Sequence, residues 1–461
     1  MQSICDHLRA LRCLDFQGCA RVTAAGVSHL SSLVLLTSLC SPLSLLHVLP
    51  SPPAVGGLAM PSAGALALAG GSLRLLLVER CTAADWRSLP AVVPALTSLI
   101  IDYEFSNPTD PLSRDDVARL ASGLPSLASL SLGHARFEGG AHGAWLGLSA
   151  ATGLTELDIR SCRFGDDDQG DGDAGLLEAL LPALPRIRSL TVMRSHFGDG
   201  DLAAIGRHLP HCLESLEFRH FLDHTVTCAG LAELAACTAL TRLDFSNVYV
   251  NVSSDAAAAG VALAAIAAAA PLKDLGLGYF GWGLKLAVDL AAFRQLTTLQ
   301  MRSPSRTALA ALPALRGSPL VHLSLSAFEL TDVELTHVAA LSQLTALEFQ
   351  SSWEPSRASS SASDDDDWDD TMTPISDAGL RALASGLVGL RALKLDLRVA
   401  DVTDAGLEAL CALPRLRRLR LRLGAAPAVT PAGVARVEEL PALLRFELGG
   451  RIVKERIVDI G

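Results

Sequence analysis

Apolar residues recur along the chain with the spacing Leu-x-x-Leu-x-apolar, at intervals of mostly two to three dozen residues. With a few Ile, Val, Met and Phe replacements, the motif occupies 11–16, 73–78, 96–101, 127–132, 154–159, 187–192, 213–218, 240–245, 272–277, 296–301, 320–325, 344–349, 390–395, 416–421 and 443–448. A degenerate copy is expected at 36–39. Such self-similarity indicates a solenoid, because one unit cannot bury its apolar face without its neighbours.

Each unit reads as a strand followed by a loop and a short helix. The fourth and sixth motif positions share one face of a strand, since side chains alternate with a period of two. Asp377 and Asp404 then stand where the helix dipole favours negative charge, and apolar residues follow at helical spacing. Hydroxyl residues that suit a helix N-cap precede several of these helices: Thr23, Ser376, Thr403 and Thr430.

The first unit is among the fullest, running from Leu11 through Cys19 and Thr23 to Leu30, and 375–380, 402–407 and 430–434 echo its second half. This layout resembles leucine-rich repeats of the cysteine-containing subclass, as in F-box/leucine-rich-repeat proteins and their F-box-free relatives. The post-strand cysteine occurs at Cys19, Cys81 and Cys162 only. The resemblance implies an α/β horseshoe of about sixteen repeats, with a concave parallel β-sheet and convex short helices.

Composition fits one long repeat array. Of 461 residues, 50% are hydrophobic and 5% aromatic, which supplies ample core. The ten cysteines are scattered without metal-ligand spacing, so they are expected to be core hydrophobes in a reducing compartment. The subclass often buries a thiol just before a strand, where Cys212 and Cys237 stand.

We expect a cytoplasmic protein without a cofactor. We also expect no membrane span, because the apolar stretch 33–49 is short and contains Pro42.

Three segments follow from the repeat spacing. Residues 1–350 are expected to be repeats, with an irregular Pro/Gly/Ala-rich excursion near 40–71. Residues 351–373 form a Ser/Asp-rich run that lacks the apolar surface needed to fold alone, and are expected to be a disordered loop. Residues 374–461 complete the array, and the alanine-rich stretch 256–270 is expected to be a convex helix.

The formal net charge of −11 comes from two acidic segments. Five aspartates lie between 166 and 173 and six between 364 and 370, so the rest of the chain is about neutral. A body without basic excess argues against nucleic-acid binding.

Sequence motifs for catalysis are missing. There is no phosphate-binding glycine loop, nucleophile elbow or His-Glu-x-x-His sequence, so we expect no enzyme. The pairs His208/His211 and His220/His224 lack a third ligand nearby in sequence and are interpreted as surface residues. Residues 167–178 have the outline of a calcium loop, but Gln169 and Ala174 depart from it and Glu178 falls inside an expected helix. We expect no metal.

The strongest candidate for binding is an outward-facing basic row on the last strands. Strand parity places five cations on the concave face, about 4.8 Å apart from strand to strand: Lys394, Arg418, Arg420, Arg422 and Arg445. The alternative is a solvated charged face. As a binding patch, these side chains suit an acidic or phosphorylated protein, through bidentate hydrogen bonds from arginine.

The second candidate is a regulatory loop that leaves the strand just before this patch. It comprises Ser361, Ser363, Asp364, Asp365, Asp366, Asp367, Trp368, Asp369 and Asp370. The hypothesis is that the loop folds back over Arg418, Arg420 and Arg422 and competes with the ligand. Phosphorylation of either serine would add negative charge.

These observations predict a monomeric, non-enzymatic protein-interaction scaffold. The resemblance implies a substrate-recognition subunit linked to ubiquitin-dependent degradation. Repeats that begin at Leu11 leave no room for an F-box before them, so the chain is expected to be either an F-box-free relative or one whose true N-terminus is missing. The alternative is a structural adaptor of a cytoskeletal or ciliary assembly. A receptor ectodomain is the third possibility. The partner, the biological process and the binding face are left open at this stage.

Overall fold

The structure is a computed structural model that divides into two compact units, Met1–Leu240 (unit 1) and Thr241–Gly461 (unit 2). It describes residues 10–15, 33, 35–41, 73–78, 83–102, 111–138, 146–160, 162–164, 176–193, 197–219, 226–246, 249–250, 256–280, 289–302, 304, 306–327, 330–351, 375–397, 400–423 and 428–455. Nearly all of the expected excursion (40–71) and of the inserted loop (351–373) therefore lies outside the described residues.

Unit 1 is built on parallel strands that pair in chain order. The described strands are β1 (Cys13–Asp15), β2 (Ser38–Ser41), β3 (Leu75–Val78), β4 (Ser98–Asp102), β5 (Ser129–Gly133), β7 (Glu156–Arg160), β9 (Ser189–Met193) and β10 (Ser215–Arg219). The degenerate copy expected at 36–39 overlaps β2, which pairs with both β1 and β3. Leu130, Leu157 and Leu190 stand side by side, so the register aligns equal motif positions.

Unit 2 repeats this plan and ends differently. Its described strands are β11 (Arg242–Asp244), β13 (Asp274–Leu277), β15 (Thr298–Arg302), β16 (His322–Ala327), β17 (Ala346–Ser351), β19 (Ala392–Leu397), β21 (Arg418–Leu423), β22 (Arg445–Leu448) and β23 (Arg451–Glu455). All pair in parallel except β23, which folds back antiparallel on β22. Gly449 and Gly450 make that reversal with φ of 59° and 84°, a region that favours glycine.

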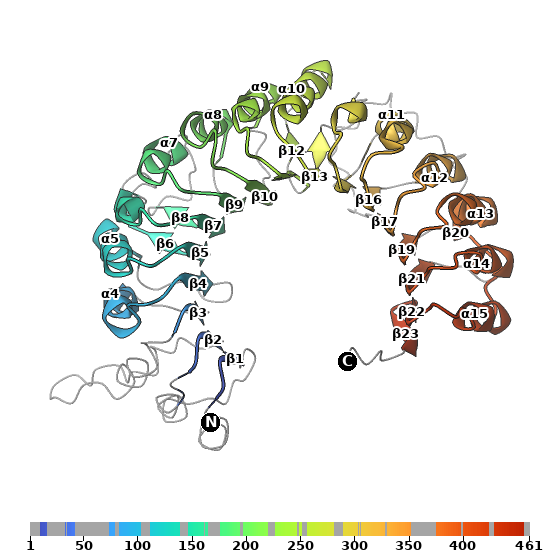
Figure 1. Ribbon diagram of the computed structural model, residues 1–461, viewed down its shortest axis with the longest axis horizontal. Coiled ribbons are helices and arrows are strands. Elements are labelled where there is room, and N and C mark those ends of the chain that lie inside the picture. The colour runs from blue at the N-terminus through green and yellow to red at the C-terminus, as the bar shows by residue number, and fades with distance from the viewer. Residues whose placement is uncertain are drawn as a thin grey trace, which may run out of the picture. The chain divides into compact units, whose positions relative to one another are not determined.

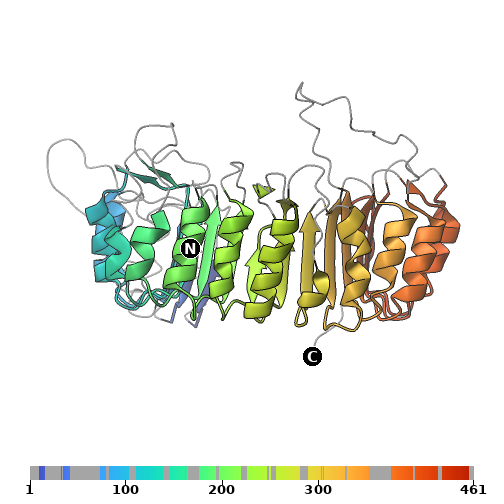
Figure 2. The same ribbon diagram turned by 90° about the horizontal axis from the view of Figure 1, so that it is seen from above.

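Helices cover the outer side of the sheet in each unit, while the strands line the inner side (Figure 1). Unit 1 has α4 (Ala83–Val92), α5 (Arg114–Gly123), α7 (Leu176–Leu180), α8 (Asp199–His208) and α9 (Cys228–Glu233). Unit 2 has α10 (Ala256–Ala269), α11 (Arg306–Ala310), α12 (Asp332–Ala339), α13 (Asp377–Gly386), α14 (Asp404–Leu410) and α15 (Pro431–Glu438). Seen from above, the helices of each unit stand in chain order (Figure 2).

Short elements complete several repeats. The 3₁₀ helices are η2 (Leu146–Ala150), η3 (Leu181–Ala183), η4 (Leu234–Ala236), η5 (Leu290–Ala292) and η6 (Leu312–Leu315). Small strand pairs join some of the loops: β6 (Arg136–Phe137) with β8 (Arg163–Phe164), β12 (Tyr249–Val250) with β14 (Tyr279–Phe280), and β18 (Ile375–Ser376) with β20 (Ala400–Asp401).

The core of each unit lies between the sheet and its helices. In the repeat of β19, Leu390, Leu393 and Leu395 are at most 2% exposed, and Leu380 and Leu383 of α13 are 1% exposed. Burying a leucine contributes roughly 1.5–3 kcal/mol, and each repeat buries several. Sixteen described parallel strands, each carrying the motif or its degenerate copy, confirm the leucine-rich-repeat solenoid that the spacing predicts.

Hydrogen bonds between neighbouring helices explain the Ser/Thr-Asp-Ala-Gly-Leu sequence at 376–380 and 403–407. Ser376 and Thr403 cap their own helices as predicted, each accepting a hydrogen bond from a backbone N–H two residues on. The aspartate of each helix also accepts from the next N-cap residue. Asp377 Oδ1 lies 2.8 Å from the Thr403 backbone nitrogen, and Asp377 Oδ2 lies 2.6 Å from the Thr403 hydroxyl. One carboxylate therefore joins two repeats.

The same bridge recurs along the outer side of each unit. Asp332 binds Ser376, Asp404 binds Thr430, and in unit 1 Asp199 binds Thr227, each through one backbone and one hydroxyl donor at 2.6–2.9 Å. From the sequence, Asp377 and Asp404 are expected only to interact with the dipole of their own helix, because the helix that each one joins begins more than twenty residues further along the chain.

Candidate functional site

The inner face of β17 to β23 carries the five predicted cations on adjacent strands of unit 2. Lys394 of β19 lies beside Arg420 of β21, and Arg418 lies beside Arg445 of β22. Arg422 lies beside Asp396. Buried leucines alternate with these residues along β19 and β21, which turns the charged side chains away from the core. We call this surface, defined by the five cations and their ion-pair partners, the inner charged face.

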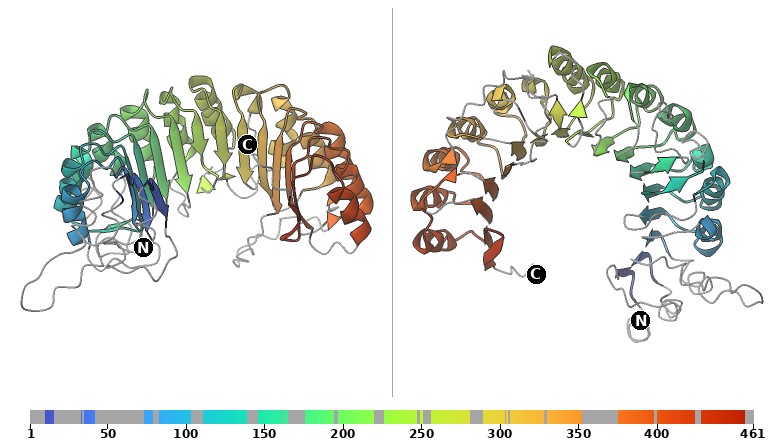
Figure 3. Two further views of the ribbon diagram at one scale, coloured as in Figure 1. Left: turned by 60° about the horizontal axis from the view of Figure 1, so that its bottom comes forward. Right: turned by 180° about the vertical axis from the view of Figure 1, so that it is seen from behind.

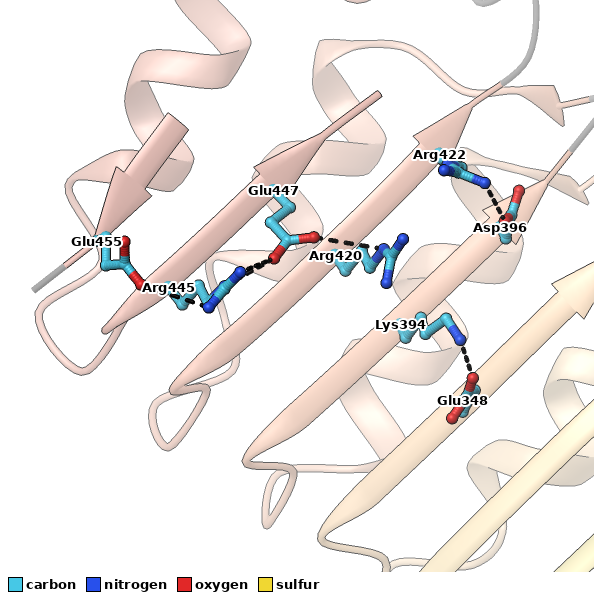
Figure 4. Close-up of polar contacts among 8 residues, drawn as sticks. All are labelled: Glu348, Lys394, Asp396, Arg420, Arg422, Arg445, Glu447 and Glu455. Carbon is cyan, nitrogen blue, oxygen red and sulfur yellow. Dashed lines mark hydrogen bonds and ion pairs between the residues drawn. The ribbon is translucent and has the colours of Figure 1, made fainter. Parts of the chain in front are cut away.

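Acidic residues from neighbouring strands pair with most of these cations, as Figure 4 shows. Lys394 is paired with Glu348 of β17. Arg422 Nη1 lies 3.3 Å from Asp396 Oδ2. Glu447 bridges two arginines, with Oε2 at 3.4 Å from Arg420 Nε and Oε1 at 2.6 Å from Arg445 Nη2.

Arg445 has a second partner in Glu455, whose Oε1 lies 3.3 Å from Arg445 Nη1. Four of the five cations thus pair with four carboxylates: Glu348, Asp396, Glu447 and Glu455. Formal charge over these nine groups is about +1 rather than +5. The inner charged face is therefore a mixed-charge network in which acidic side chains separate the basic ones.

Strand parity in the sequence also places three of these four acids on the inner charged face. Asp396 and Glu447 stand two residues from a predicted cation on the same strand, and Glu348 occupies the equivalent position of the preceding repeat. Glu455 is different, because its place beside Arg445 depends on the antiparallel turn of β23. No motif position predicts that turn.

A hollow of about 620 Å³ opens on this face. Its lining comes from β16 to β23 and includes His322, Ala346, Ala392, Arg418 and Arg445, together with Glu348, Lys394, Arg420, Glu447 and Glu455. Figure 3 shows the strands that carry these residues from two further sides. Arg418 is exposed, and within the described part of the chain its side chain makes no ion pair or hydrogen bond.

The predicted regulatory loop lies outside the described residues. This holds for Ser361, Ser363, Asp364, Asp365, Asp366, Asp367, Trp368, Asp369 and Asp370, and likewise for the calcium-like sequence around 167–173. The competition between the loop and a ligand of the inner charged face stays a hypothesis.

Unit 1 has a smaller polar cluster on the inner side of its sheet. Asp158 accepts hydrogen bonds from the Ser131 hydroxyl at 3.1 Å and from Arg160 Nε at 2.8 Å. Ser131 is 7% exposed and lies on the strand next to Asp158. Both hydrogen bonds go to Asp158 Oδ2, and among the described residues the buried Asp158 Oδ1 has no hydrogen-bond partner.

Histidines and cysteines take structural positions where they are described. His208 Nε2 lies 3.6 Å from Glu178 Oε1, and His211 Nδ1 lies 3.1 Å from the Thr238 hydroxyl. Cys237 is fully buried, and burial, followed by the nearby Cys212, raises its thiol pKa to about 12. In the parts of the chain that the structure describes, no three His, Cys, Asp or Glu residues converge as a metal site.

No helix among the described residues is long and apolar enough to cross a bilayer.

No protein-family model and no curated protein sequence matches the chain. Among solved structures it is similar to a chain of the Rad7 and Elc1 complex of yeast, with 16% identity, 82% of this chain and 81% of that chain covered, and a TM-score of 0.45. It is also similar to a leucine-rich-repeat protein of Leptospira interrogans, with 12% identity, 97% of this chain and 98% of that chain covered, and a TM-score of 0.43. An internalin of Listeria monocytogenes has 17% identity, with 79% of this chain and 76% of that chain covered, and a TM-score of 0.37.

Proposed function

We propose that this leucine-rich-repeat protein is a non-enzymatic scaffold that binds a protein partner on the inner charged face of unit 2. The observation that carries the proposal is the hollow across β16 to β23, whose walls bring Arg418 and three ion-paired cations together on one exposed sheet. Inner faces of repeat arrays are their usual binding surfaces, because stacking makes them long and continuous. Arginine also supplies planar paired donors suited to carboxylate or phosphate.

The finer proposal is that the partner is a substrate destined for ubiquitin-dependent degradation. It rests on the resemblance of the repeats to the cysteine-containing subclass, which is an analogy between folds. The second candidate, a structural adaptor in a cytoskeletal or ciliary assembly, uses the same face. What separates the two is which proteins accompany the chain in its cell.

The experiment is quantitative co-purification of the tagged full chain, compared between two charge-reversal variants. Arg418→Glu changes the inner charged face, whereas Arg381→Glu changes an exposed position on the outer helix α13. Partners that are lost with the first variant and kept with the second support the binding face. Equal recovery with both variants would overturn it.

The identity of those partners tests the finer proposal. Recovery of cullin-type ligase subunits with the wild-type chain supports a role in degradation. Recovery of cytoskeletal or motor proteins without ligase subunits supports the adaptor and contradicts the degradation role.

A further inference from the structure

The floor of the hollow is set by two small residues on adjacent strands. Along one row of the sheet, the register places His322, Ala346, Ala392, Arg418 and Arg445 on successive strands. An alanine side chain ends at Cβ, so the two alanines leave space between the longer side chains around them. The hollow thus has an apolar floor formed by Ala346 and Ala392, with His322 on one side of it and Arg418 on the other.

The cations around this floor differ in whether they already form ion pairs within the protein. Lys394, Arg420 and Arg445 already share Glu348, Glu447 and Glu455, and the side chain of Glu447 is only 16% exposed. Arg418 stands among them without an ion pair in the described part of unit 2. A ligand anion can pair with Arg418 without breaking a contact that already exists.

We infer that the hollow binds an extended peptide through one anionic side chain, a carboxylate or a phosphate, which pairs with Arg418 while its neighbours cross the floor of Ala346 and Ala392. The inference rests on the proposed function and names the class of partner. A bidentate contact from a guanidinium to such a group is stronger than a neutral hydrogen bond.

A run of acidic residues fits this surface less well than a single one. Glu348, Glu447 and Glu455 lie around the hollow and would repel further negative charges. Binding additional anions to Arg420 or Arg445 would require breaking the pairs with Glu447. The surface therefore favours one anion flanked by uncharged or basic residues.

The distance from His322 to Arg418 determines how many peptide residues can contact the hollow. His322 and Arg418 are three strand spacings apart, roughly 14 Å at about 4.8 Å per strand. An extended peptide covers that distance with about four residues at roughly 3.3 Å each. A short linear segment is long enough to touch both sides.

The test uses the full chain and heptapeptide libraries with phosphoserine, glutamate or serine fixed at the centre. Flanking positions are drawn either from apolar and basic residues or from Asp and Glu. The expected result is enrichment of a central anion with non-acidic flanks. Preference for phosphoserine over glutamate assigns the anion as phosphate, the reverse preference assigns it as carboxylate, and equal enrichment of both over serine shows that the hollow accepts either anion.

Variants connect that selection to the hollow. Arg418→Ala should reduce binding of the best enriched peptide at least tenfold, and Ala392→Leu should do so by filling the floor without changing charge. Arg422→Ala is the matched control, because Arg422 belongs to the same face but does not line the hollow. Melting temperatures of all variants are compared with wild type to exclude unfolding.

Three results would overturn the inference. The first is preference for acid-rich flanks, and the second is an equal loss of binding with Arg418→Ala and Arg422→Ala. A third pattern separates this inference from the proposed function. If uncharged peptides are selected and Ala392→Leu still abolishes their binding, the scaffold function stands and the single-anion inference fails.

Discussion

At the scale of single residues, the absence of a side chain at certain glycines determines how repeats join. A Cβ built on Gly406 would stand 2.3 Å from Oδ1 of Asp377, the carboxylate that binds Thr403. Equivalent approaches occur at Gly379 and Gly433. Glycine in the Asp-Ala-Gly-Leu sequence therefore leaves room for the aspartate of the preceding repeat.

We expect Gly406→Ala to lower the free energy of unfolding by about 1–3 kcal/mol, because the displaced Asp377 carboxylate would lose its hydrogen bonds to Thr403. Gly389→Ala is the matched control in the same unit, since its added Cβ would meet only two carbonyl oxygens at ordinary contact distances of 3.6 and 3.7 Å. Urea unfolding of both variants measures the difference. Equal stabilities would contradict this account of the glycine.

A buried carboxylate gives unit 1 a predictable pH dependence. Burial raises the pKa of Asp116, but hydrogen bonds from Arg87 at 2.6 Å and from the Ser113 hydroxyl at 2.8 Å outweigh it, and the pKa is lowered overall. A folded-state pKa below the unfolded value of about 3.9 stabilises the protein above that value. This stability is lost as pH falls through the folded-state pKa.

Wild type should therefore be more stable than Asp116→Asn at pH 7, and the difference should narrow when unfolding is measured at pH 3. The exposed neighbour Asp115 lies on the same helix, and Asp115→Asn serves as the control with little expected effect. A difference of the same size at both pH values would show that Asp116 stabilises the fold without its charge.

At the scale of elements, β23 forms an edge of the sheet of unit 2 among the described strands, and its residues disfavour pairing with another chain. β23 contains Arg451, Lys454 and Glu455, and its register with β22 shifts between Phe446 and Glu447. Charges and bulges are the usual means of keeping an edge strand from joining another chain. Lys454 also binds the carbonyl oxygens of Glu438 and Leu440 at the end of α15.

Replacing Lys454 with an apolar residue should allow the exposed edge of β23 to pair with a second copy of the protein. Ile452 and Val453 are already 53% and 36% exposed, so Lys454→Val would create three consecutive apolar residues on an edge strand. We expect self-association that rises with concentration, measured by sedimentation velocity. Lys454→Arg keeps a charge and should stay monodisperse, and a monodisperse Lys454→Val protein would contradict the protective role of Lys454.

At the scale of the whole molecule, stability is distributed along the array, because each repeat packs mainly against its two neighbours. β19 pairs only with β17 and β21 among the described strands. A destabilising substitution in one repeat should therefore lower the stability of the neighbouring repeats most, with a smaller effect on repeats further along the chain.

Leu395→Ala tests this locality. Leu395 is fully buried in β19, and a buried Leu→Ala change costs about 2–5 kcal/mol. Hydrogen exchange should show reduced amide protection in β17, β19 and β21, while β4 and β5 of unit 1 keep theirs. Val388→Ala, at a position 55% exposed, is the control. A uniform loss of protection over both units would mean that the array unfolds as one cooperative body.

Sequence alone was sufficient for the architecture, because a repeat is a local property of the chain. Spacing and parity identified Leu393 and Leu395 as inward and Lys394 as outward, and hydroxyl residues marked the helix starts at Ser376 and Thr403. These features depend only on residues a few positions apart, so they can be read without knowing which repeats touch.

Tertiary structure decided the electrostatics of the candidate site. Lys394 meets Glu348 across 46 positions and Arg420 meets Glu447 across 27, and the turn at Gly449 brings Glu455 to Arg445. The predicted basic row is therefore a neutralised network in which Arg418 stands apart. Charges act through space, and only the stacking of repeats and the final turn determine which of them are neighbours.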